Sequence, residues 1–291
     1  MTDAALRSHP RAAEYARGTR IPVSRVVFYA GLSIFALVWF APVFILIFTA
    51  LKSASDFAHG GTFSLPRHIE WANFSKAWDV GIRIYFANSA MMTLVKVPTG
   101  VLIASLAAFA LTFLRLPGER WIFTFFIVGL VVPIQMTLVP LTLLLRSVDL
   151  IDSLFGLFWI YLGFGLPFAI LVMRGYMRSI PRELIDAAFI DGCTWFGVFW
   201  RIVLPLSKPA VVSLIIFDGI ATWSEFILAQ IFLRQNTNRT LPLGLVNFQT
   251  EFSTAYELLA AAQCITIVPL VLVYLFFQRY FVDGLSGSLK S

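Results

Sequence analysis

The sequence predicts an all-α membrane protein with six transmembrane helices and both termini in the cytoplasm. Of its 291 residues, 59% are hydrophobic and 13% are charged, whereas a soluble domain averages roughly 45–50% and about 25%. The apolar residues form six runs, each long enough to cross a bilayer core of about 30 Å as a helix. The Lys and Arg residues are divided unequally between the two sides that these runs define.

The six apolar runs are interrupted by few charges. They are too long for barrel strands and lack alternation at every second residue, so helices are expected. The first run exceeds the about 7–15 apolar residues of a signal-peptide core, so we expect it to be retained as a span. The predicted spans are Val26–Leu51, Ile84–Leu114, Trp121–Leu145, Leu154–Met173, Val211–Phe232 and Leu258–Gln278.

The basic residues give the orientation. With the N-terminus inside, 14 Lys and Arg lie on the cytoplasmic side and 7 on the outer side, and Lys96 inside the second span completes the 22. This bias follows the positive-inside rule and places both termini in the cytoplasm. The net charge of +6 is therefore interpreted as a topology signal, and nucleic acid is not expected as a partner.

Prolines recur inside five of the six spans. Such prolines free backbone groups and kink a helix where neighbouring helices can compensate. They indicate either irregular packing alone or broken helices around a pathway that opens and closes, and the sequence does not decide between the two. The residues are Pro42, Pro98, Pro133, Pro140, Pro167 and Pro269.

The reactive side chains form no pattern of a catalytic or metal site. Cys193 and Cys264 have no partners at metal-ligand spacing, and the three histidines lie outside the spans. A membrane enzyme would need a constellation such as H-E-x-x-H within its spans. We therefore expect no enzyme, no metal and no cofactor.

The cytoplasmic loop of residues 174–209 predicts two short amphipathic helices. Pro181 suits a helix start, and Asp191-Gly192 suits a turn that needs a permissive backbone. The second helix carries an apolar stripe that the loop cannot bury alone. Such a hairpin fits the membrane interface or a groove in another protein, and both interpretations stay open on these features. The stripe comprises Trp195, Phe196, Phe199, Trp200 and Val203.

The same loop carries a specific resemblance. Asp186-Ala187-Ala188-Phe189-Ile190-Asp191-Gly192-Cys193, followed by Phe199, Ile202 and Leu204-Pro205, resembles the EAA motif of binding-protein-dependent ABC permeases, E-A-A-x-x-D-G-A followed by F, I and L-P. The spacing fits without a gap. Asp186 stands where glutamate is usual and Cys193 where alanine is usual, and both changes preserve charge or size.

Further segments are similar to the carbohydrate-uptake branch of this family, and more narrowly to the smaller six-span permease of maltose-type importers. The resemblance extends from about Ile21 to the C-terminus. The segments are Val139-Pro140-Leu141, Trp223-Ser224-Glu225-Phe226, the stretch 239–245 and the ending 277–285.

The resemblance implies a type I ABC importer permease fold and a division of the chain. Residues 1–25 would be a cytoplasmic N-terminal segment and residues 26–51 the first transmembrane helix. Residues 84–280 would be the ABC importer transmembrane domain with its coupling loop 174–209, and residues 281–291 a cytoplasmic tail. The protein would lie in the inner membrane as a multi-pass subunit, in contact with membrane lipid.

The resemblance also implies a function and its partners. The chain would be the permease subunit of an ATP-driven sugar importer, forming half of the pathway beside a second homologous permease as a heterodimer. An extracytoplasmic sugar-binding protein would deliver the substrate, for which the outer loop of residues 52–83 is a reasonable docking surface. An ABC ATPase dimer would bind ATP, since no lysine here lies in the phosphate-binding pattern G-x-x-x-x-G-K-[ST].

The coupling residues implied by the motif lie in two groups. Asp186, Ala187, Ala188, Asp191 and Gly192 would form the helix that docks on the ATPase. Asp186 would offer its charge to a basic partner, and Gly192 would let the backbone turn in a tight groove. The apolar side would be anchored by Trp195, Phe196 and Phe199.

Ionisable groups inside spans are candidates for the transport pathway. Charges there are costly and usually face a bundle interior or a water-filled cavity. Asp218 and Glu225 lie seven residues apart, which predicts one face of the fifth helix, and Lys96 lies in the second span. Either these groups contact the sugar or they form a structural pair, for example Lys96 with one acid. Trp223 either stacks on a sugar ring or packs at the interface.

Two alternatives remain at this stage. A related permease for a non-sugar solute, such as a glycerol phosphate ester, would carry the same coupling loop. A gradient-driven secondary transporter would usually show internal repeats and helices broken at matched positions. The sequence shows no convincing repeat, and a coupling loop has no purpose in such a carrier.

Overall fold

The computed structural model describes the backbone of residues 23–249 and 255–287, and side chains as far as Gln278. Among these residues, four helices are single, long and apolar enough to cross a membrane, and two bent helix pairs raise the number to as many as six. The four single spans belong to α1 (Val23–Ala50), α4 (Arg83–Phe113), α7 (Leu154–Met177) and α14 (Tyr256–Gly287).

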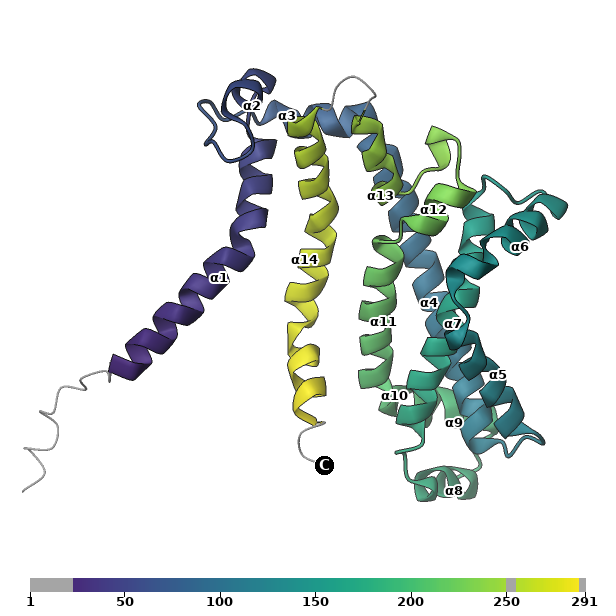
Figure 1. Ribbon diagram of the computed structural model, residues 1–291. Helices are drawn as coiled ribbons and strands as arrows, with labels where there is room; N and C mark the ends of the chain where they lie inside the picture. Colours follow the sequence, from purple (N-terminus) through teal and green to yellow (C-terminus); the bar gives the residue numbers. More distant parts are fainter. Residues whose placement is uncertain (1–22, 250–254, 288–291) are drawn as a thin grey trace, which may run out of the picture.

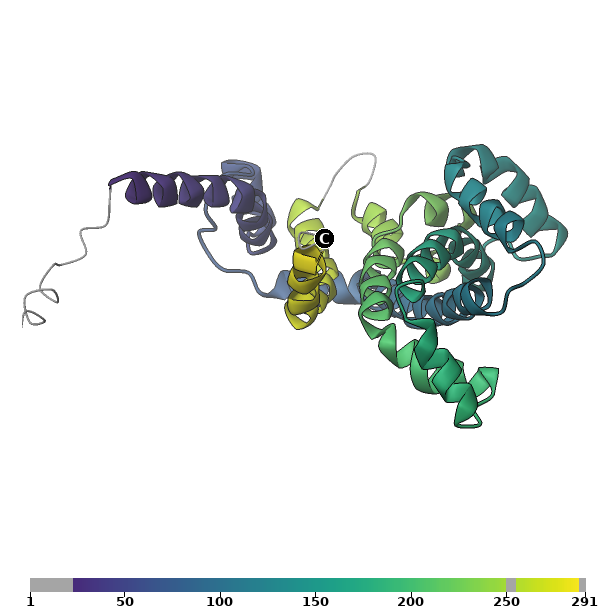
Figure 2. The same ribbon diagram turned by 90° about the horizontal axis from the view of Figure 1, so that it is seen from below.

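A central body of helices is flanked on both sides. In Figure 1 and Figure 2, α4, α7 and α11 (Lys208–Trp223) lie together, with α5 (Glu119–Val131) and α6 (Ile134–Ser147) on one side and α14 on the other. Helix α1 splays away from this body and meets it at its C-terminal end, where α14 packs on it and Asn73 donates to the carbonyl oxygen of Ala50. Among the described side chains of α1, only those of Thr49 and Ala50 are buried, so most of its surface is left for lipid or another chain.

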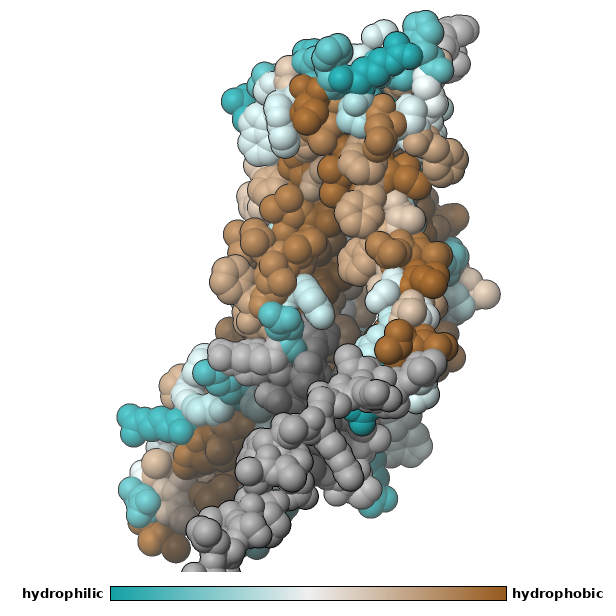
Figure 3. Space-filling model, turned by 90° about the vertical axis from the view of Figure 1, so that its left-hand side faces the viewer, coloured by the Kyte–Doolittle hydropathy of each residue, from teal (hydrophilic) through white to brown (hydrophobic). Residues whose placement is uncertain are grey.

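The apolar surface and the chain ends agree with a membrane orientation. Figure 3 shows hydrophobic side chains over the middle of one face and hydrophilic ones at its upper end. The start of α1, the end of α14 and the loop helix α8 (Arg182–Ile190) all lie at the opposite, lower end (Figure 1). Residues 1–22 of the predicted N-terminal segment and the side chains of the predicted tail 281–291 lie outside the described part.

The second span begins before the predicted residue. It is preceded by α3 (Ala72–Ala77) and the π-helical turn η1 (Trp78–Ile82), so the chain is helical from Ala72 onward. Gly81 adopts φ 151°, which is outside the helical range and marks a kink. This conformation favours glycine because a Cβ atom would be strained there.

The third predicted span, Trp121–Leu145, is not one helix. Helices α5 and α6 meet at an angle of 102°, and Val132 and Pro133 between them are extended, with ψ of 115° and 126°. Pro133 donates no backbone hydrogen bond and disfavours a helical conformation at the residue before it. Of the two interpretations of the prolines, a broken helix holds here, whereas Pro42, Pro98, Pro140, Pro167 and Pro269 lie inside helices.

The prediction of one helix over Val211–Phe232 is also wrong. Helix α11 ends at Trp223 and the short helix α12 (Ile227–Phe232) follows after a break. On its cytoplasmic side, α11 meets the preceding segment of residues 195–206 at an angle of 72°. That segment comprises α9 (Trp195–Val198), the π-helical turn η2 (Phe199–Val203) and α10 (Leu204–Leu206).

Two groups of hydrogen bonds hold the outer loops. The buried Lys52 ammonium donates to the carbonyl oxygens of Gly61 and Thr62 at 2.8 and 3.0 Å, and burial lowers the pKa of Lys52 although Asp56 opposes the shift. Asp152 accepts from the backbone N–H groups of Arg234 and Gln235 at 2.8 and 3.1 Å. Burial acts to raise the pKa of Asp152, but these hydrogen bonds outweigh it and hold the pKa below its ordinary value.

Candidate functional site: the coupling loop and a polar pocket between the spans

The cytoplasmic loop folds as the two predicted helices with a turn between them. Helix α8 begins after Pro181, and Asp191 and Gly192 form the turn that leads to α9. Gly192 adopts φ +81°, a left-handed conformation that costs an L-residue roughly 1–2 kcal/mol. The Thr194 side chain then accepts from the N–H of Gly197 at the start of α9. The sequence signals for this turn are confirmed.

The loop presents one face to the body and another to solvent. Ile185 and Ala188 of α8 are buried against the helix bundle, whereas Asp186 and Ala187 are exposed. Ile190 at the end of α8 is 87% exposed. Figure 1 shows α8 projecting below the ends of the spanning helices. The exposed face is thus smaller than the motif alone suggests, since Ala188 belongs to the buried face.

The apolar stripe of the second loop helix is divided between core and surface. Phe199 is 1% exposed, and its ring centroid lies 5.3 Å from that of Phe109 of α4. Phe199 therefore anchors the loop to its own chain. In this conformation it offers no contact to a partner, contrary to the expectation that it helps to anchor the apolar side of the loop on the ATPase. Trp195 is 42% exposed, with its ring centroid 4.6 Å from that of Phe189, and Phe196 is 72% exposed.

A pocket of about 210 Å³ lies between α4, α6, α7, α11 and the start of α12. We call it the polar pocket because Lys96, Tyr161, Asp218, Thr222 and Glu225 line it together with apolar residues. Lys96 of α4 is 3% exposed and forms an ion pair with Asp218 of α11. Its ammonium also donates to the hydroxyl of Thr222 at 3.3 Å. The structural alternative for Lys96, a pair with one acid, is therefore what the structure contains. Gly165 of α7 leaves room for this pair, because a Cβ atom there would lie 2.8 Å from the lysine nitrogen.

Glu225 lines the same pocket but is held differently. Its carboxylate accepts from the hydroxyl of Tyr161 at 2.5 Å and from the backbone N–H groups of Leu228 and Ala229 at 2.7 and 3.1 Å. It lies beyond the end of α11, so the expectation that Glu225 and Asp218 share a face of one helix is wrong. The break between α11 and α12 brings Glu225 into the pocket. At the same time, the Glu225 carboxylate satisfies backbone N–H groups at the start of α12.

Trp223 is placed outside this pocket. It is 6% exposed, its indole N–H donates to the carbonyl oxygen of Thr266 at 3.1 Å, and its ring contacts Phe86 edge-on at 5.3 Å. Trp223 thus joins α11 to α4 and α14. Its ring also lines a separate, mostly apolar cavity of about 190 Å³ between α4, α11 and α14.

Among the described residues, no three His, Cys, Asp or Glu side chains gather where they could hold a metal ion. The polar groups of the pocket are an ion pair, a carboxylate and two hydroxyls, all of which can hydrogen-bond to a hydroxylated solute.

Comparison with known proteins now decides the family. Residues 100–287 match the family of binding-protein-dependent transport system inner membrane components. The chain belongs to this family. A probable ABC transporter permease of Bacillus subtilis, YurM, is 37% identical over 251 residues, which cover 86% of this chain and 83% of that protein.

Other relatives and a solved structure agree with this result. The arabinooligosaccharides transport system permease AraQ of Bacillus subtilis is 31% identical over 280 residues, 92% of this chain and 96% of that protein. The diacetylchitobiose uptake system permease DasC of Streptomyces coelicolor is 30% identical over 270 residues, which cover 92% of this chain and 95% of that protein. A crystal structure of a bacterial ABC transporter that imports alginate contains a chain similar to this one, with a TM-score of 0.79 and 24% identity. The match covers 91% of this chain and 98% of that chain.

This permease is thus an inner-membrane transport subunit with the type I importer fold, as its sequence predicts. Membership of a binding-protein-dependent family removes the gradient-driven carrier from consideration. Sequence reasoning did not single out Tyr161, Thr222 or Gly165. A tyrosine hydroxyl inside an apolar span needs a polar partner, and this requirement was the signal that could have drawn attention to Tyr161.

Glu225 is expected to hold the break between α11 and α12. In Glu225→Ala, one hydroxyl and two backbone donors lose a charged acceptor, and such bonds contribute about 1.5–3 kcal/mol each without adding fully. We expect the free energy of unfolding of the permease to fall by about 2–4 kcal/mol, measured by thermal unfolding in detergent.

Two milder variants serve as controls for this prediction. Tyr161→Phe removes one of the three donors, and Glu225→Gln keeps an acceptor, so both should lower the melting temperature less than Glu225→Ala does. If all three variants had the melting temperature of the wild type, Glu225 would not hold the break.

Proposed function

We propose that this permease conducts a sugar or short oligosaccharide across the inner membrane, as one half of the pathway of an ATP-driven importer. The observation that carries the proposal is the polar pocket formed by Lys96, Asp218, Glu225, Tyr161 and Thr222 among apolar helices. Hydroxyl groups of a sugar hydrogen-bond equally well to donors and acceptors, and the pocket offers both kinds. Charged groups at this depth usually line substrate pathways.

The size of the pocket supports a second permease as partner. Its volume of about 210 Å³ lies below the roughly 300–1,000 Å³ of typical small-molecule sites. A site shared with a second chain would supply the remainder. We propose a heterodimer, with a homologous permease closing the other side of the pathway.

The names of the relatives support a carbohydrate as the solute. AraQ is described as a permease for arabinooligosaccharides, DasC as one for diacetylchitobiose, and SmoH of Agrobacterium fabrum, 34% identical, as one for sulfoquinovosyl glycerol. All three solutes contain a sugar. A glycerol phosphate ester contains none, and these relatives give it no support.

The exposed part of the coupling loop supports docking of an ABC ATPase dimer. Ile190 and Phe196 are apolar side chains that protrude into solvent, and the Asp186 carboxylate is exposed beside them. Protruding apolar residues next to a charge fit a groove in a partner better than free solution. In this proposal the partner binds ATP, and the permease has no ATPase activity or cofactor of its own.

The outer loop supports docking of a soluble binding protein. Phe63, Leu65 and Trp71 are all more than half exposed there, on a segment that Lys52 and Asn73 fix to the end of α1. A related solved structure contains a periplasmic binding protein together with the alginate transporter. We propose a sugar-binding protein as the corresponding partner here.

The proposal is tested by isolating the permease with a mild detergent from native membranes and identifying its partners by mass spectrometry. We expect an ABC ATPase, a second permease and a soluble binding protein. The binding protein is then screened against neutral oligosaccharides and against glycerol phosphate esters. The complex in proteoliposomes should hydrolyse ATP faster when the binding protein and its sugar are both added.

Two results would overturn the proposal. Recovery of the permease without an ATPase under several mild detergents would remove the coupling role of the loop. A binding protein that takes glycerol phosphate esters and rejects sugars would keep the importer and replace the solute.

A further inference from the structure

Three arginines surround a cavity of about 140 Å³ at the cytoplasmic ends of α4, α5 and α7. Arg174, Arg178 and Arg182 line it, and Glu119 is the only acidic residue in its lining. The guanidinium of Arg174 lies 3.7 Å from the Glu119 carboxylate and 4.0 Å from the centre of the Phe123 ring. The lining therefore carries an excess of two positive charges.

These arginines are only partly used by the protein itself. Arg174 and Arg182 donate to carbonyl oxygens at the end of α4, of Leu111 and Thr112, at 3.4 and 3.3 Å. Arg174 is nevertheless 4% exposed, and its Nε atom has no hydrogen-bond partner among the described residues. Arg178 is exposed. A buried guanidinium with an unmet donor beside two further cations is a site for an anion.

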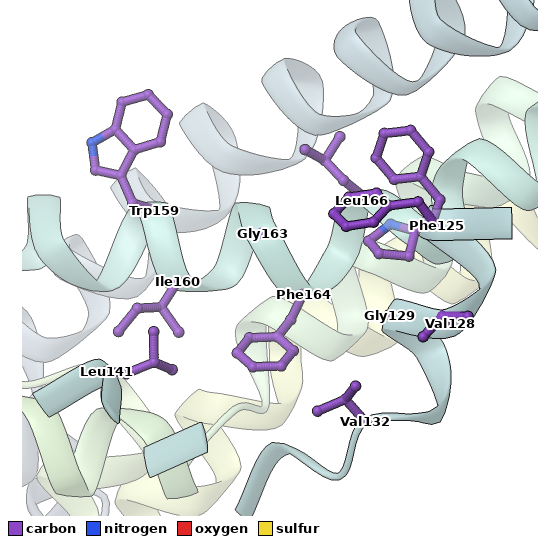
Figure 4. Close-up of a pocket in the computed structure, with 12 residues that line it drawn as sticks. Phe125, Val128, Gly129, Val132, Leu141, Trp159, Ile160, Gly163, Phe164 and Leu166 are labelled. Atoms are coloured by element: carbon purple, nitrogen blue, oxygen red, sulfur yellow. The ribbon is translucent and has the colours of Figure 1, made fainter. Parts of the chain in front are cut away.

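A large apolar cavity begins about two helical turns away on the same two helices. It has a volume of about 580 Å³ and lies between α7 and the bent pair α5–α6. Figure 4 shows Ile160 of α7 directed toward Leu141 of α6, with Phe164 and Val132 along the same side. Gly163 of α7 leaves the wall open, since nothing lies within 4 Å of a Cβ atom there, whereas Gly129 of α5 lies against Pro167 of α7.

The two cavities are aligned along one pair of helices. On α7, Arg174 is seven residues beyond Pro167 in the apolar cavity, a rise of about 10 Å. On α5, Phe123 stacks on Arg174 and Phe126 lines the apolar cavity. Positive charge at the cytoplasmic end of this helix pair is thus followed, about two turns further along, by an apolar slot nearer the membrane centre. We refer to the two cavities together as the groove.

We infer that this groove binds an anionic phospholipid of the cytoplasmic leaflet. The phosphate would lie among Arg174, Arg178 and Arg182, and an acyl chain would fill the slot. Basic pockets between spanning helices on the cytoplasmic side bind anionic headgroups, and the apolar slot supplies what a free phosphate cannot use. The three arginines belong to the first part of the coupling loop 174–209, and Arg182 is the first residue of α8. The apolar cavity shares Phe164 with the pocket of Lys96 and Glu225.

The lipid is favoured over a protein partner by the surroundings of the groove. None of the described residues of α5 is buried, and Trp121, Phe125 and Val131 are 80%, 75% and 76% exposed. This helix therefore presents apolar side chains from the level of the arginines upward. A bound lipid would cover both parts of the groove with one molecule.

The test is lipid titration of the purified transporter complex, followed by native mass spectrometry. The probes are a phosphatidylglycerol and a phosphatidylcholine with identical acyl chains, with inorganic phosphate as a competitor. We expect the phosphatidylglycerol to bind at least tenfold more tightly than the phosphatidylcholine. Millimolar phosphate should not displace it, because phosphate leaves the slot empty.

Two variants separate the parts of the site. Arg178→Gln should weaken phosphatidylglycerol binding about fivefold, the effect of one basic side chain at an anionic membrane surface, and leave phosphatidylcholine unchanged. Gly163→Leu places a side chain in the slot and should weaken binding at least fivefold with all arginines intact. Arg201→Gln and Gly31→Leu are matched controls outside the groove and should bind as the wild type does.

Four results would overturn the inference. Equal binding of the two lipids would show that the arginines do not recognise the headgroup. Displacement by phosphate would show a free-anion site. Wild-type binding in both Arg178→Gln and Gly163→Leu, or a partner subunit crosslinked to a cysteine placed at Gly163, would show that the lipid does not occupy the groove.

Discussion

Replacing Gly192 with valine is expected to uncouple ATP hydrolysis from sugar uptake. Gly192 has φ +81°, where a β-branched residue is a genuine outlier, so Gly192→Val must rebuild the turn between α8 and α9. The exposed Ile190 and Phe196 lie on either side of this turn, and their relative placement would change. We expect uptake in proteoliposomes to fall at least tenfold while the basal ATPase rate remains.

Three variants show whether the turn itself is responsible. Gly192→Asn should keep more than half of the uptake, because asparagine tolerates the left-handed conformation. Gly118→Val introduces the same strain at φ +75° in the loop before α5 and should leave coupling intact. Asp186→Lys keeps the turn, reverses the charge offered to the partner, and should also uncouple. Substrate-driven uptake at the wild-type rate in Gly192→Val would remove the turn from the coupling mechanism.

Breaking the ion pair of Lys96 is expected to lower the stability of the permease strongly. Lys96→Met leaves the Asp218 carboxylate without its partner. Loss of one member of a buried pair costs about 3–5 kcal/mol, and we expect the lower end because the Asp218 side chain keeps 19% exposure. The double variant Lys96→Met/Asp218→Leu should recover the melting temperature, since apolar residues can replace such a pair without loss.

Uptake by the double variant separates the two roles of the pair. If Lys96 and Asp218 belong to the pathway, the stable double variant should retain less than a tenth of the uptake. Normal uptake would instead show a purely structural pair. Gly165→Ala tests the packing of the pair without removing a charge, because the new Cβ atom would lie 2.8 Å from the Lys96 nitrogen. Gly163→Ala on the same helix is the control, since nothing lies within 4 Å of its Cβ atom. Only Gly165→Ala should lower the melting temperature.

Much of the fold follows from the sequence because the bilayer restricts the choices. A run of about 20 apolar residues must be helical in lipid, and the positions of α1, α4, α7 and α14 agree with the predicted spans. The two broken spans could not be placed from hydropathy alone. Pro133 signals a break, yet five other prolines lie inside helices, and the outcome depends on whether neighbouring side chains can satisfy the freed backbone groups.

The break after Trp223 has no proline to announce it. At this break the Glu225 carboxylate accepts hydrogen bonds from the N–H groups of Leu228 and Ala229 and from the hydroxyl of Tyr161, which lies on another helix. The pairing of Lys96 with Asp218 spans 122 residues, and sequence spacing cannot select one acid over another at such a distance. Tertiary contact decides both features.

In the coupling loop, the sequence located the turn and the helices but not the division between core and surface. Phe196 and Phe199 are both apolar members of one stripe. Phe199 packs on Phe109, a contact set by the packing of α4, and only Phe196 remains exposed. A periodic pattern identifies an apolar face and does not say which molecule covers it.

The contact between α1 and α14 has a consequence for biosynthesis. Leu46 and Ala50 near the end of α1 share an apolar cluster with Ala260 and Ala261 of α14, so a helix that is synthesised early packs on one that is synthesised much later. The intervening 205 residues, from Leu51 to Ala255, take about 10–40 s to synthesise at roughly 5–20 residues per second. During that time α1 must persist in the bilayer without its partner, and a chain truncated before α14 would leave it exposed to membrane quality control.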